Sequence, residues 1–272
     1  MADARSSSPV STVLVTGASS GIGLELAVIC AREGHRPVLV ARREDALHEV
    51  AQRIEQTYGV YPDVVAVDLA EPGATRVLVD TLETRGIAVD MLVNNAGFAT
   101  RGFFSRIELE ATHELLEVNV VALTTLTRLL LPEMLARRSG RILNVASIAG
   151  YFPGPLTATY NASKAYVISF TEALANELKG TGVTATALCP GPTRTGFEVR
   201  AGLSTTQAFR GPVMDAKAVA EEGYRAMMRG VTIAVPGVEN RLRMWPVRFV
   251  PRWLLAHFAR RFHETAEDAQ PR

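Results

Sequence analysis

The sequence predicts an α/β fold, a single doubly wound sheet of about seven mostly parallel strands with helices on both faces. Short β-branched runs alternate with longer helical patterns along the 272 residues, and this alternation is typical of parallel strands joined by crossover helices. Several runs are apolar throughout, as expected for strands that helices cover on both sides. No repeat or linker divides the chain, so we expect one domain.

The expected elements follow one another in a regular order. Strands are predicted by β-branched apolar runs at 12–17, 36–41, 63–68, 90–97, 140–147, 182–191 and 231–236. Helices are predicted by helical apolar spacing at 21–33, 44–58, 72–85, 108–136, 157–179 and about 215–229. Gly34 and Gly180 follow two of these helices, where a left-handed residue often ends a helix. This order places the domain at 10–237, after a stretch, 1–9, that we expect to be disordered.

Charge and histidine content argue against two kinds of partner. The 29 Lys and Arg residues nearly balance the 28 Asp and Glu residues, so the net charge of +1 gives no overall reason to expect nucleic acid. The five histidines form no ligand pattern with cysteines or carboxylates. We therefore expect no metal site and no nucleic-acid partner.

Cysteine use and hydropathy favour the cytoplasm. Cys30 and Cys189 are far apart and each lies in an apolar run, as buried free thiols do in a reducing compartment. The N-terminus lacks the apolar core and cleavage site of a signal peptide. The segment 118–127 is one of the longest uncharged apolar runs, and it is shorter than the roughly 20 residues of a membrane span. These features predict a soluble, cytoplasmic protein.

The segment TGASSGIG, residues 16–23, follows the first predicted strand and opens the first helix. Gly17, Gly21 and Gly23 would let the backbone turn tightly and approach a pyrophosphate, whose charge then faces free N–H groups at the helix N-terminus. The alternative is a glycine-rich turn without a ligand. The position between a strand and a helix is the context that favours a dinucleotide.

The end of the second strand, VLVARRED at 38–45, bears on which dinucleotide binds. An acidic residue at this point would accept hydrogen bonds from a ribose 2′-hydroxyl, whereas arginine pairs with a 2′-phosphate. Here Ala41 is followed by Arg42 and Arg43, so the sequence favours NADP over NAD. The alternative is that both arginines are merely solvated loop charges, with or without pairing to the next two acidic residues.

Together these motifs resemble those of the short-chain dehydrogenase/reductase family over about 12–236. Further parts of the pattern are Asp68 after the third strand, NNAG at 94–97, Asn119, Ser147, Tyr160 with Lys164 in TYNASKAY, and PGPTRT at 190–195. One departure is Ser20, where NADP-preferring relatives often have a basic residue, so the preference for NADP depends on Arg42 and Arg43. The resemblance implies a Rossmann-type fold and cofactor contacts from Gly17, Ser19, Ser20, Gly21, Ile22, Gly23, Arg42, Arg43, Asp68, Leu69, Asn95, Ala96, Gly97, Tyr160, Lys164, Pro190, Gly191, Thr193 and Thr195.

Tyr160 and Lys164 are one helical turn apart, so a phenol and an ammonium share one face of a helix. An unperturbed tyrosine ionises at about pH 10 and is a poor acid or base at neutral pH, whereas a nearby positive charge lowers its pKa. The resemblance adds that Lys164 binds the ribose hydroxyls of the nicotinamide. It also implies that Tyr160 is the general acid or base for a ketone or an alcohol.

Two more residues complete the catalytic set that the resemblance implies. Ser147, at the end of the fifth strand, would hydrogen-bond the reacting oxygen and hold it in place. As a hydrolase nucleophile, Ser147 would need a G-x-S-x-G elbow, which NVASIAG lacks. Asn119, inside the long helix that begins near Thr112, would hold a water that links Lys164 to solvent. Alternatively, Asn119 is a side chain in the interior of a helix that hydrogen-bonds the backbone.

Aromatic residues gather just after the predicted catalytic strands and indicate an apolar substrate pocket. They are Phe98, Phe103, Phe104, Tyr151, Phe152 and Phe197, any one of which taken alone would be ordinary packing. The loop 196–214, rich in small residues, is expected to close over the pocket. The predicted function is NADP(H)-dependent interconversion of a ketone and a secondary alcohol on a lipophilic substrate, by a homodimer or homotetramer.

Two other functions share parts of this pattern. A catalytically silent dinucleotide-binding regulatory or scaffold protein should lack one of Ser147, Tyr160 or Lys164, and this chain has all three. A sugar-nucleotide epimerase or dehydratase also uses Y-x-x-x-K. Such an enzyme would need a different glycine spacing and a larger C-terminal domain than the chain provides after the Tyr160 helix.

The predicted C-terminal extension, 238–272, differs from the rest of the chain. Its segment 240–263 has six arginines, no acidic residue and both tryptophans, and apolar residues at helical spacing after Pro251 predict an amphipathic basic helix. In one interpretation the apolar face packs on the protein or on a neighbouring subunit and covers the substrate pocket. In the other the segment makes peripheral contact with an anionic membrane, with Trp245, Trp253 and Phe258 at the headgroup level.

Overall fold

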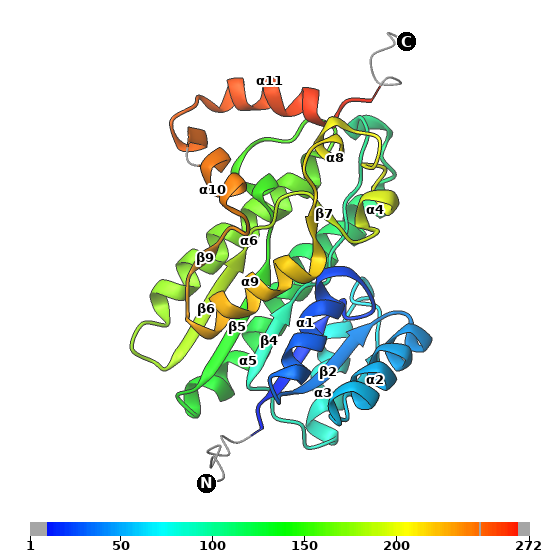
Figure 1. The fold of residues 1–272 in the computed structure, drawn as a ribbon, viewed down its shortest axis with the longest axis vertical. Helices are drawn as coiled ribbons and strands as arrows, with labels where there is room; N and C mark the ends of the chain where they lie inside the picture. The colour runs from blue at the N-terminus through cyan, green and yellow to red at the C-terminus, as the bar shows by residue number, and fades with distance from the viewer. Residues whose placement is uncertain (1–9, 245, 266–272) are drawn as a thin grey trace.

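The computed structural model describes residues 10–244 and 246–265, so the N-terminal stretch 1–9 and the predicted membrane anchor Trp245 lie outside the described residues. In this part of the chain a seven-stranded sheet has the order β3-β2-β1-β4-β5-β6-β9, and all of its pairings are parallel (Figure 1). The strands are β1 (Thr12–Thr16), β2 (Arg36–Ala41), β3 (Asp63–Ala66), β4 (Met91–Asn94), β5 (Gly140–Val145), β6 (Val183–Leu188) and β9 (Ile233–Ala234). The predicted fold class is confirmed, and the strand order reverses between β1 and β4, where α/β sheets bind ligands.

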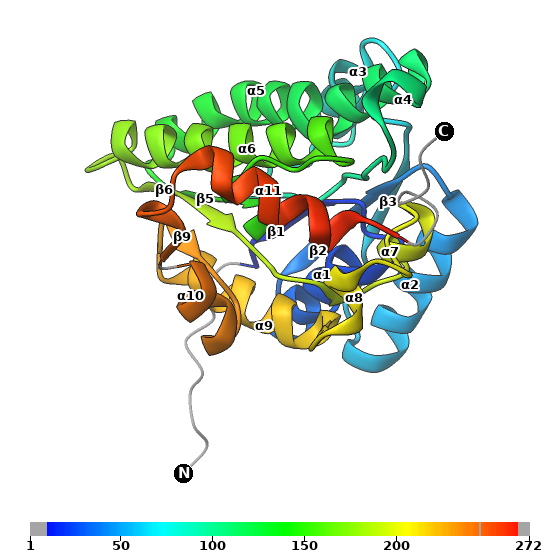
Figure 2. The same cartoon turned by 90° about the horizontal axis from the view of Figure 1, so that it is seen from above.

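Helices cover both faces of the sheet (Figure 2). One layer contains α1 (Gly21–Arg32), α2 (Glu44–Tyr58) and α9 (Ala216–Met228). The other contains α3 (Ala74–Thr84), α4 (Leu109–Leu116), α5 (Leu123–Ala136) and α6 (Ala158–Glu177). Each layer therefore buries one apolar side of every helix against the sheet, which is the main stabilising term for a fold of this kind.

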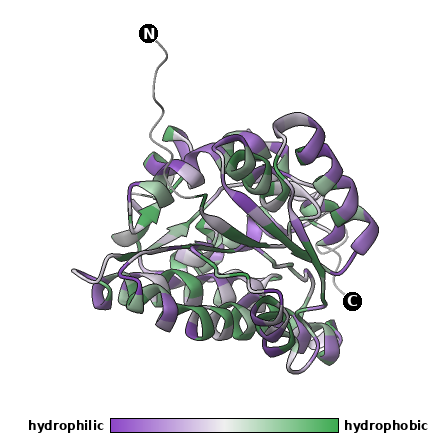
Figure 3. Ribbon diagram, turned by 90° about the horizontal axis from the view of Figure 1, so that it is seen from below, coloured by the Kyte–Doolittle hydropathy of each residue, from purple (hydrophilic) through white to green (hydrophobic). Residues whose placement is uncertain are grey.

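The central strands are apolar along their whole length because both of their faces are covered. In β1, Val13 and Val15 belong to the apolar cluster that includes Ile29 of α1, whereas Leu14 between them belongs to the cluster that includes Leu126 of α5. All five side chains are buried. Figure 3 shows hydrophobic strands between two layers of helices. Along the helices, hydrophilic residues alternate with hydrophobic ones.

The long helix predicted at 108–136 is present but not uniform. It begins at Leu109 and not near Thr112, because the N–H of Thr112 donates to the carbonyl of Glu108 and closes the first turn. Between α4 and α5 it passes through a π-helical segment, η2 (Glu117–Ala122). By length and composition this helix could cross a membrane, but a core helix of a soluble protein passes the same test, and 44% of its most apolar window is buried inside the fold.

The carboxyl ends of the strands are covered by irregular segments and by the C-terminal helices. After β6 come β7 (Thr193–Arg194), α7 (Phe197–Arg200), α8 (Gln207–Arg210) and β8 (Met214–Asp215), and β7 pairs with β8. After β9 come α10 (Val238–Met244), the turn η4 (Pro246–Arg248) and α11 (Arg252–His263). Figures 1 and 2 show α11 lying across this edge of the molecule, so the extension contributes to whatever binds there.

Candidate active site

A cavity of about 1040 Å³ lies at the carboxyl edge of the sheet and extends from the glycine-rich turn after β1 to α11. The predicted cofactor and catalytic residues that line it are Gly17, Ser19, Ser20, Gly21, Ile22, Arg42, Arg43, Asp68, Leu69, Asn95, Ala96, Gly97, Ser147, Tyr160, Lys164, Pro190, Gly191, Thr193 and Thr195. Gly23 and Asn119 are buried and do not line it. The fold therefore gathers nearly all of the predicted residues, which are far apart in sequence, around one space.

The glycine-rich turn is tied to the end of β4. Gly17 has a positive φ of 67°, and a Cβ added there would lie 2.8 Å from Asn95 Nδ2. Thr16 Oγ1 accepts hydrogen bonds of 3.0 Å from the N–H groups of both Asn95 and Ala96. Helix α1 begins at Gly21, and the Ser20 side chain makes no capping hydrogen bond to its first turn. Free N–H groups at a helix N-terminus favour an anion, so this end of the cavity fits a pyrophosphate.

Arg42 and Arg43 lie at the same end of the cavity, after β2. Arg42 Nη1 is 3.4 Å from Asp68 Oδ2, and Arg43 Nη2 is 3.4 Å from Ser19 Oγ. Within 10–244 and 246–265 neither arginine pairs with the acidic residues that follow it. Both guanidinium groups therefore border the space where a ribose phosphate would fit.

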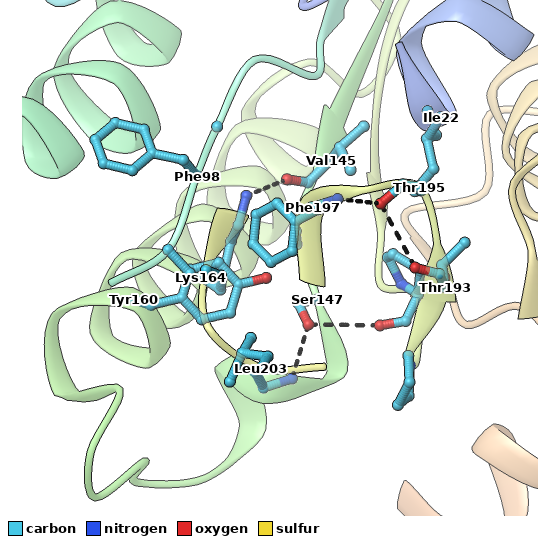
Figure 4. A pocket seen from close by; sticks show the side chains of 18 of the residues that line it. Ile22, Phe98, Val145, Ser147, Tyr160, Lys164, Thr193, Thr195, Phe197 and Leu203 are labelled. Atoms are coloured by element: carbon cyan, nitrogen blue, oxygen red, sulfur yellow. Dashed lines mark hydrogen bonds between the residues drawn. The ribbon is translucent and has the colours of Figure 1, made fainter. Parts of the chain in front are cut away.

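Ser147, Tyr160 and Lys164 meet at the end of β5 (Figure 4). Lys164 Nζ donates to the carbonyl of Val145 at 2.8 Å and lies 5.8 Å from the centroid of the Tyr160 ring. Ser147 Oγ accepts from the N–H of Ala149 at 3.1 Å, which fixes its orientation. In Figure 4 the Tyr160 hydroxyl points towards Ser147, so one oxygen atom placed between these two hydroxyls would contact both.

The pKa values of this group differ from what the sequence predicted. Burial raises the pKa of Tyr160 to about 12, and the hydrogen bond with Ser147 opposes this shift only in part. The lowering expected from Lys164 does not outweigh burial, and Lys164 Nζ lies 5.8 Å from the centroid of the Tyr160 ring and donates to the carbonyl of Val145. Burial also lowers the pKa of Lys164 to about 8. At neutral pH the phenol is therefore protonated, which is the state of a proton donor.

Asn119 lies in the π-helical segment and is hydrogen-bonded on both ends of its amide. Its Oδ1 accepts from the N–H of Phe98 at 3.1 Å, and its Nδ2 donates to the carbonyl of Phe98 at 3.0 Å and to Ser163 Oγ at 3.1 Å. A Cβ added to Gly97 would lie 3.0 Å from Asn119 Oδ1 and 3.5 Å from Lys164 Nζ. The Asn119 side chain therefore bonds the backbone of Phe98, in the loop after β4, and not the backbone of its own helix. It also lies on the same side of Gly97 as Lys164.

Part of the predicted aromatic pocket forms next to Tyr160. Phe98, Phe152 and Phe197 line the cavity, and the Phe197 and Tyr160 ring centroids are 5.7 Å apart. The other three predicted aromatic residues do not line it: Phe103 borders a neighbouring cavity, Phe104 is 62% exposed, and Tyr151 packs in the cluster that contains Cys189.

The sequence analysis did not single out Leu203 and Phe209, two apolar residues of the loop 196–214 that line the cavity. Leu255, Phe258 and Phe262 on α11 also line it, which fits the interpretation that the apolar face of this helix covers the substrate pocket. The apolar spacing of α11 is visible in the sequence, but the surface against which it packs is not. Within the loop no periodic pattern marks the lining residues.

Helix α11 is held over the cavity by hydrogen bonds at its C-terminal end. Arg101 Nε donates to the carbonyl of His263 at 3.0 Å, and Arg101 Nη2 donates to Thr265 Oγ1 at 3.0 Å. The buried His263 ring contacts Pro155 O at 3.1 Å and Thr157 Oγ1 at 3.2 Å through Nδ1. Burial lowers the pKa of His263, so the ring is neutral in this contact at neutral pH. One face of α11 therefore packs on the protein.

Comparisons with known proteins show the family of the chain. The short chain dehydrogenase family model matches residues 11–204. Ketoacyl reductase HetN from Nostoc sp. is 35% identical over 214 residues, which are 75% of this chain and 74% of that protein. Very-long-chain 3-oxoacyl-CoA reductase from Anas platyrhynchos is 34% identical over 183 residues, which are 65% of this chain and 58% of that protein.

Two solved structures have a similar fold over nearly the whole length of this chain. A short-chain dehydrogenase from Sphingobium yanoikuyae in complex with NADPH is 31% identical with a TM-score of 0.80, covering 95% of this chain and 100% of its own. The bulky-bulky ketone specific alcohol dehydrogenase from Comamonas testosteroni is 26% identical with a TM-score of 0.77. The match covers 97% of this chain and 100% of that chain. The chain therefore belongs to the short-chain dehydrogenase/reductase family of NAD(P)-dependent oxidoreductases.

Proposed function

We propose that the protein is an NADP(H)-dependent oxidoreductase that interconverts a ketone and a secondary alcohol on a lipophilic substrate. The observation that carries this proposal is the position of the Tyr160 hydroxyl, which points towards Ser147 at the border between the cofactor end and the apolar end of one cavity. A carbonyl oxygen bound there would be within reach of a protonated phenol.

Each residue of the group has a role in this reaction. Tyr160 donates its proton to the ketone oxygen, and in the reverse direction it accepts the proton of the alcohol. Ser147 hydrogen-bonds the same oxygen and holds it in place. Lys164 binds the ribose of the nicotinamide, and Asn119 positions the backbone at Phe98 and takes part in returning a proton to Tyr160. When bound, the cofactor supplies or accepts the hydride at the carbon atom of the carbonyl group.

The preference for NADP rests on Arg42 and Arg43. Both guanidinium groups border the cofactor end of the cavity, one near Asp68 and one near Ser19. Two guanidinium groups at this point would pair with a 2′-phosphate, which only NADP carries. The relative from Sphingobium yanoikuyae, solved with NADPH, supports the same choice.

The apolar end of the cavity favours a substrate with a large hydrophobic body. Its lining includes Phe98, Phe197, Leu203, Leu255 and Phe258. Relatives named ketoacyl reductase, 3-oxoacyl-CoA reductase and bulky-ketone alcohol dehydrogenase support a long or bulky ketone. The test is NADPH consumption, read at the nicotinamide absorbance, with 3-oxoacyl thioesters and bulky aryl ketones. If NADPH binds but no ketone or alcohol is turned over, the alternative of a silent dinucleotide-binding regulatory protein replaces this proposal.

We also propose that the protein is cytoplasmic and touches an anionic membrane through the outer side of its C-terminal extension. The inner side of α11 lines the cavity, whereas Trp253 is 73% exposed and Leu242 of α10 is 69% exposed. Arg252 and Arg261 are exposed on the same helix as Trp253. An exposed tryptophan next to arginines is suited to a headgroup layer, and a lipophilic substrate would then enter from the lipid.

The proposed assembly is a homodimer or homotetramer. Three apolar side chains on neighbouring helices are partly exposed: Leu116 of α4 at 37%, Val121 of η2 at 44% and Tyr166 of α6 at 38%. The Tyr166 hydroxyl is 2.9 Å from Thr124 Oγ1, which joins α6 to α5 on this surface. A second copy would cover this apolar surface.

A further inference from the structure

A second cavity, of about 500 Å³, lies beside the catalytic one, and we call it the arginine cavity. It is formed by the loop 99–107 and by residues 200–202 at the end of α7. Its charged side chains among the described residues are Arg101, Arg106 and Arg200, and no described carboxylate lines it. Guanidinium groups that border one space make it attractive to an anion.

The arginine cavity is close to the catalytic tyrosine. Both cavities are lined by Ala99, Arg200 and Ala201. Ala99 and Ala201 also form a small buried cluster with Leu203, against which the Tyr160 ring packs. The two cavities therefore adjoin at Ala99 and Ala201, so a substrate held at Tyr160 and extending past Ala99 would bring its next group into the arginine cavity.

Two of the arginines have charge available for a ligand. Arg106 and Arg200 are exposed and make no ion pair with any residue in 10–244 or 246–265. The Arg106 guanidinium lies 5.1 Å from the centroid of the Phe103 ring, which keeps it at the cavity. Arg101 is fixed by its bonds to His263 and Thr265, so one member of the group is held in place before any ligand binds.

The other arginines near the arginine cavity are either paired with a carboxylate or lie outside this cavity. Arg260 lies 5.9 Å from the same Phe103 ring, but it is paired with Glu264 at 2.5 Å. Arg42 and Arg43 are at the cofactor end of the large cavity and do not line the arginine cavity. An anion in the arginine cavity would therefore be separate from the phosphate of NADP.

We propose that the arginine cavity binds an oxyanion at the polar end of the substrate while the apolar body lies in the catalytic cavity. Guanidinium groups pair with phosphate or carboxylate through charge-assisted, bidentate hydrogen bonds. The substrate is thus an amphiphile, either an acyl thioester whose carrier group bears phosphate or a long-chain keto acid. This inference deepens the proposed function, and its test depends on binding and not on turnover.

The test uses matched ligands that the enzyme cannot reduce, titrated calorimetrically into the NADP-saturated protein. For phosphate the pair is decanoyl-coenzyme A and the neutral decanoyl thioester of N-acetylcysteamine; for carboxylate it is decanoate and its methyl ester. The charged member of at least one pair should bind about tenfold more tightly, a difference of about 1.4 kcal/mol, because its oxyanion can accept charge-assisted hydrogen bonds from the arginines. The pair that shows the difference identifies the source of the anion.

The variants then locate the anion. R106Q/R200Q should remove the advantage of the charged ligand, leave the affinity of the neutral ligand within about twofold, and weaken the dependence of affinity on salt. The matched control is R76Q, an exposed arginine on α3 away from both cavities. Equal affinity for charged and neutral ligands in the wild-type protein, or an equal loss of both in R106Q/R200Q, would overturn the inference. Absence of turnover with every ketone would instead contradict the proposed function, whatever the binding data show.

Discussion

Lys164 Nζ donates a 2.8 Å hydrogen bond to the carbonyl oxygen of Val145, which anchors a fully buried ammonium at the end of β5. The same ammonium lies 5.8 Å from the centroid of the Tyr160 ring. Burial raises the pKa of Tyr160 to about 12 and lowers the pKa of Lys164 to about 8, so at neutral pH the phenol is protonated and the lysine is close to its titration point. The pKa values of these two residues therefore determine how each direction of catalysis depends on pH.

The two directions of the reaction should respond to pH in opposite ways. The pKa of Tyr160 is raised to about 12, so the phenol that reduction needs is present throughout neutral pH and the phenolate that oxidation needs becomes more abundant as pH rises. We expect kcat for alcohol oxidation to increase steadily from pH 7 to about pH 10, with reduction favoured at the low end. Lys164, with a pKa lowered to about 8, should lose its charge first, so KM for NADPH should rise above that pH. An oxidation rate that falls over the same range while the protein stays folded would contradict this account.

Cofactor selectivity should depend on the first arginine after β2. Arg42→Ala should raise KM for NADP by roughly tenfold and change KM for NAD by less than about twofold, because only NADP carries the phosphate that the guanidinium would bind. The matched control is Arg53→Ala. Arg53 is also an exposed arginine, but it lies on α2 and does not line the cavity. A wild-type preference for NAD, or equal effects of Arg42→Ala on both cofactors, would mean that Arg42 is ordinary surface charge.

Membrane contact can be tested by flotation with anionic and neutral vesicles. The full-length wild-type protein should float with anionic vesicles, and Trp253→Ser with Leu242→Ser should abolish flotation, since these two exposed side chains are the proposed anchors. The matched control is Tyr61→Ser, which changes a side chain that is 69% exposed and is far from the extension in sequence. If the wild-type protein stays in solution with both kinds of vesicle, the extension serves only the cavity and the membrane proposal is wrong.

The oligomeric state can be tested on the surface formed by η2 and α6. Val121→Glu places a charge among the exposed apolar side chains there and should convert the assembly to monomers in light scattering. Val77→Glu, at a 60% exposed position on α3, is the control and should leave the mass unchanged. A monomeric wild-type protein would rule out the homodimer and the homotetramer together.

Much of this arrangement could be predicted because each part has a local cause in the sequence. The apolar runs of β1 and β2 require cover on both faces, and a glycine with positive φ such as Gly17 follows directly from the turn into α1. Residues at the ends of parallel strands meet at one edge, which is why Ser147 and Asn95 could be assigned to the same site.

The rest depends on tertiary contacts that no local pattern contains. The spacing of Tyr160 and Lys164 predicts a shared helix face but not the bond to Val145, which sets the direction of the ammonium. In the same way, the apolar spacing of α11 predicts a helix. Its position over the cavity, however, depends on the hydrogen bond from Arg101 to His263, two residues that are far apart in the sequence. The arginine cavity needs both the loop after β4 and the end of α7, so the sequence alone did not reveal it.

The central claim is that the Tyr160 hydroxyl transfers the proton while Lys164, one helical turn away, binds the cofactor. The most direct test compares Tyr160→Phe with Lys164→Ala in steady-state rates and in NADPH binding titrations. Tyr160→Phe should reduce kcat by about 100-fold or more and leave the Kd of NADPH within about twofold, because only the proton-transfer hydroxyl is removed. Lys164→Ala should impair both turnover and NADPH binding. Full activity in Tyr160→Phe, with the protein folded and NADPH bound, would contradict the mechanism.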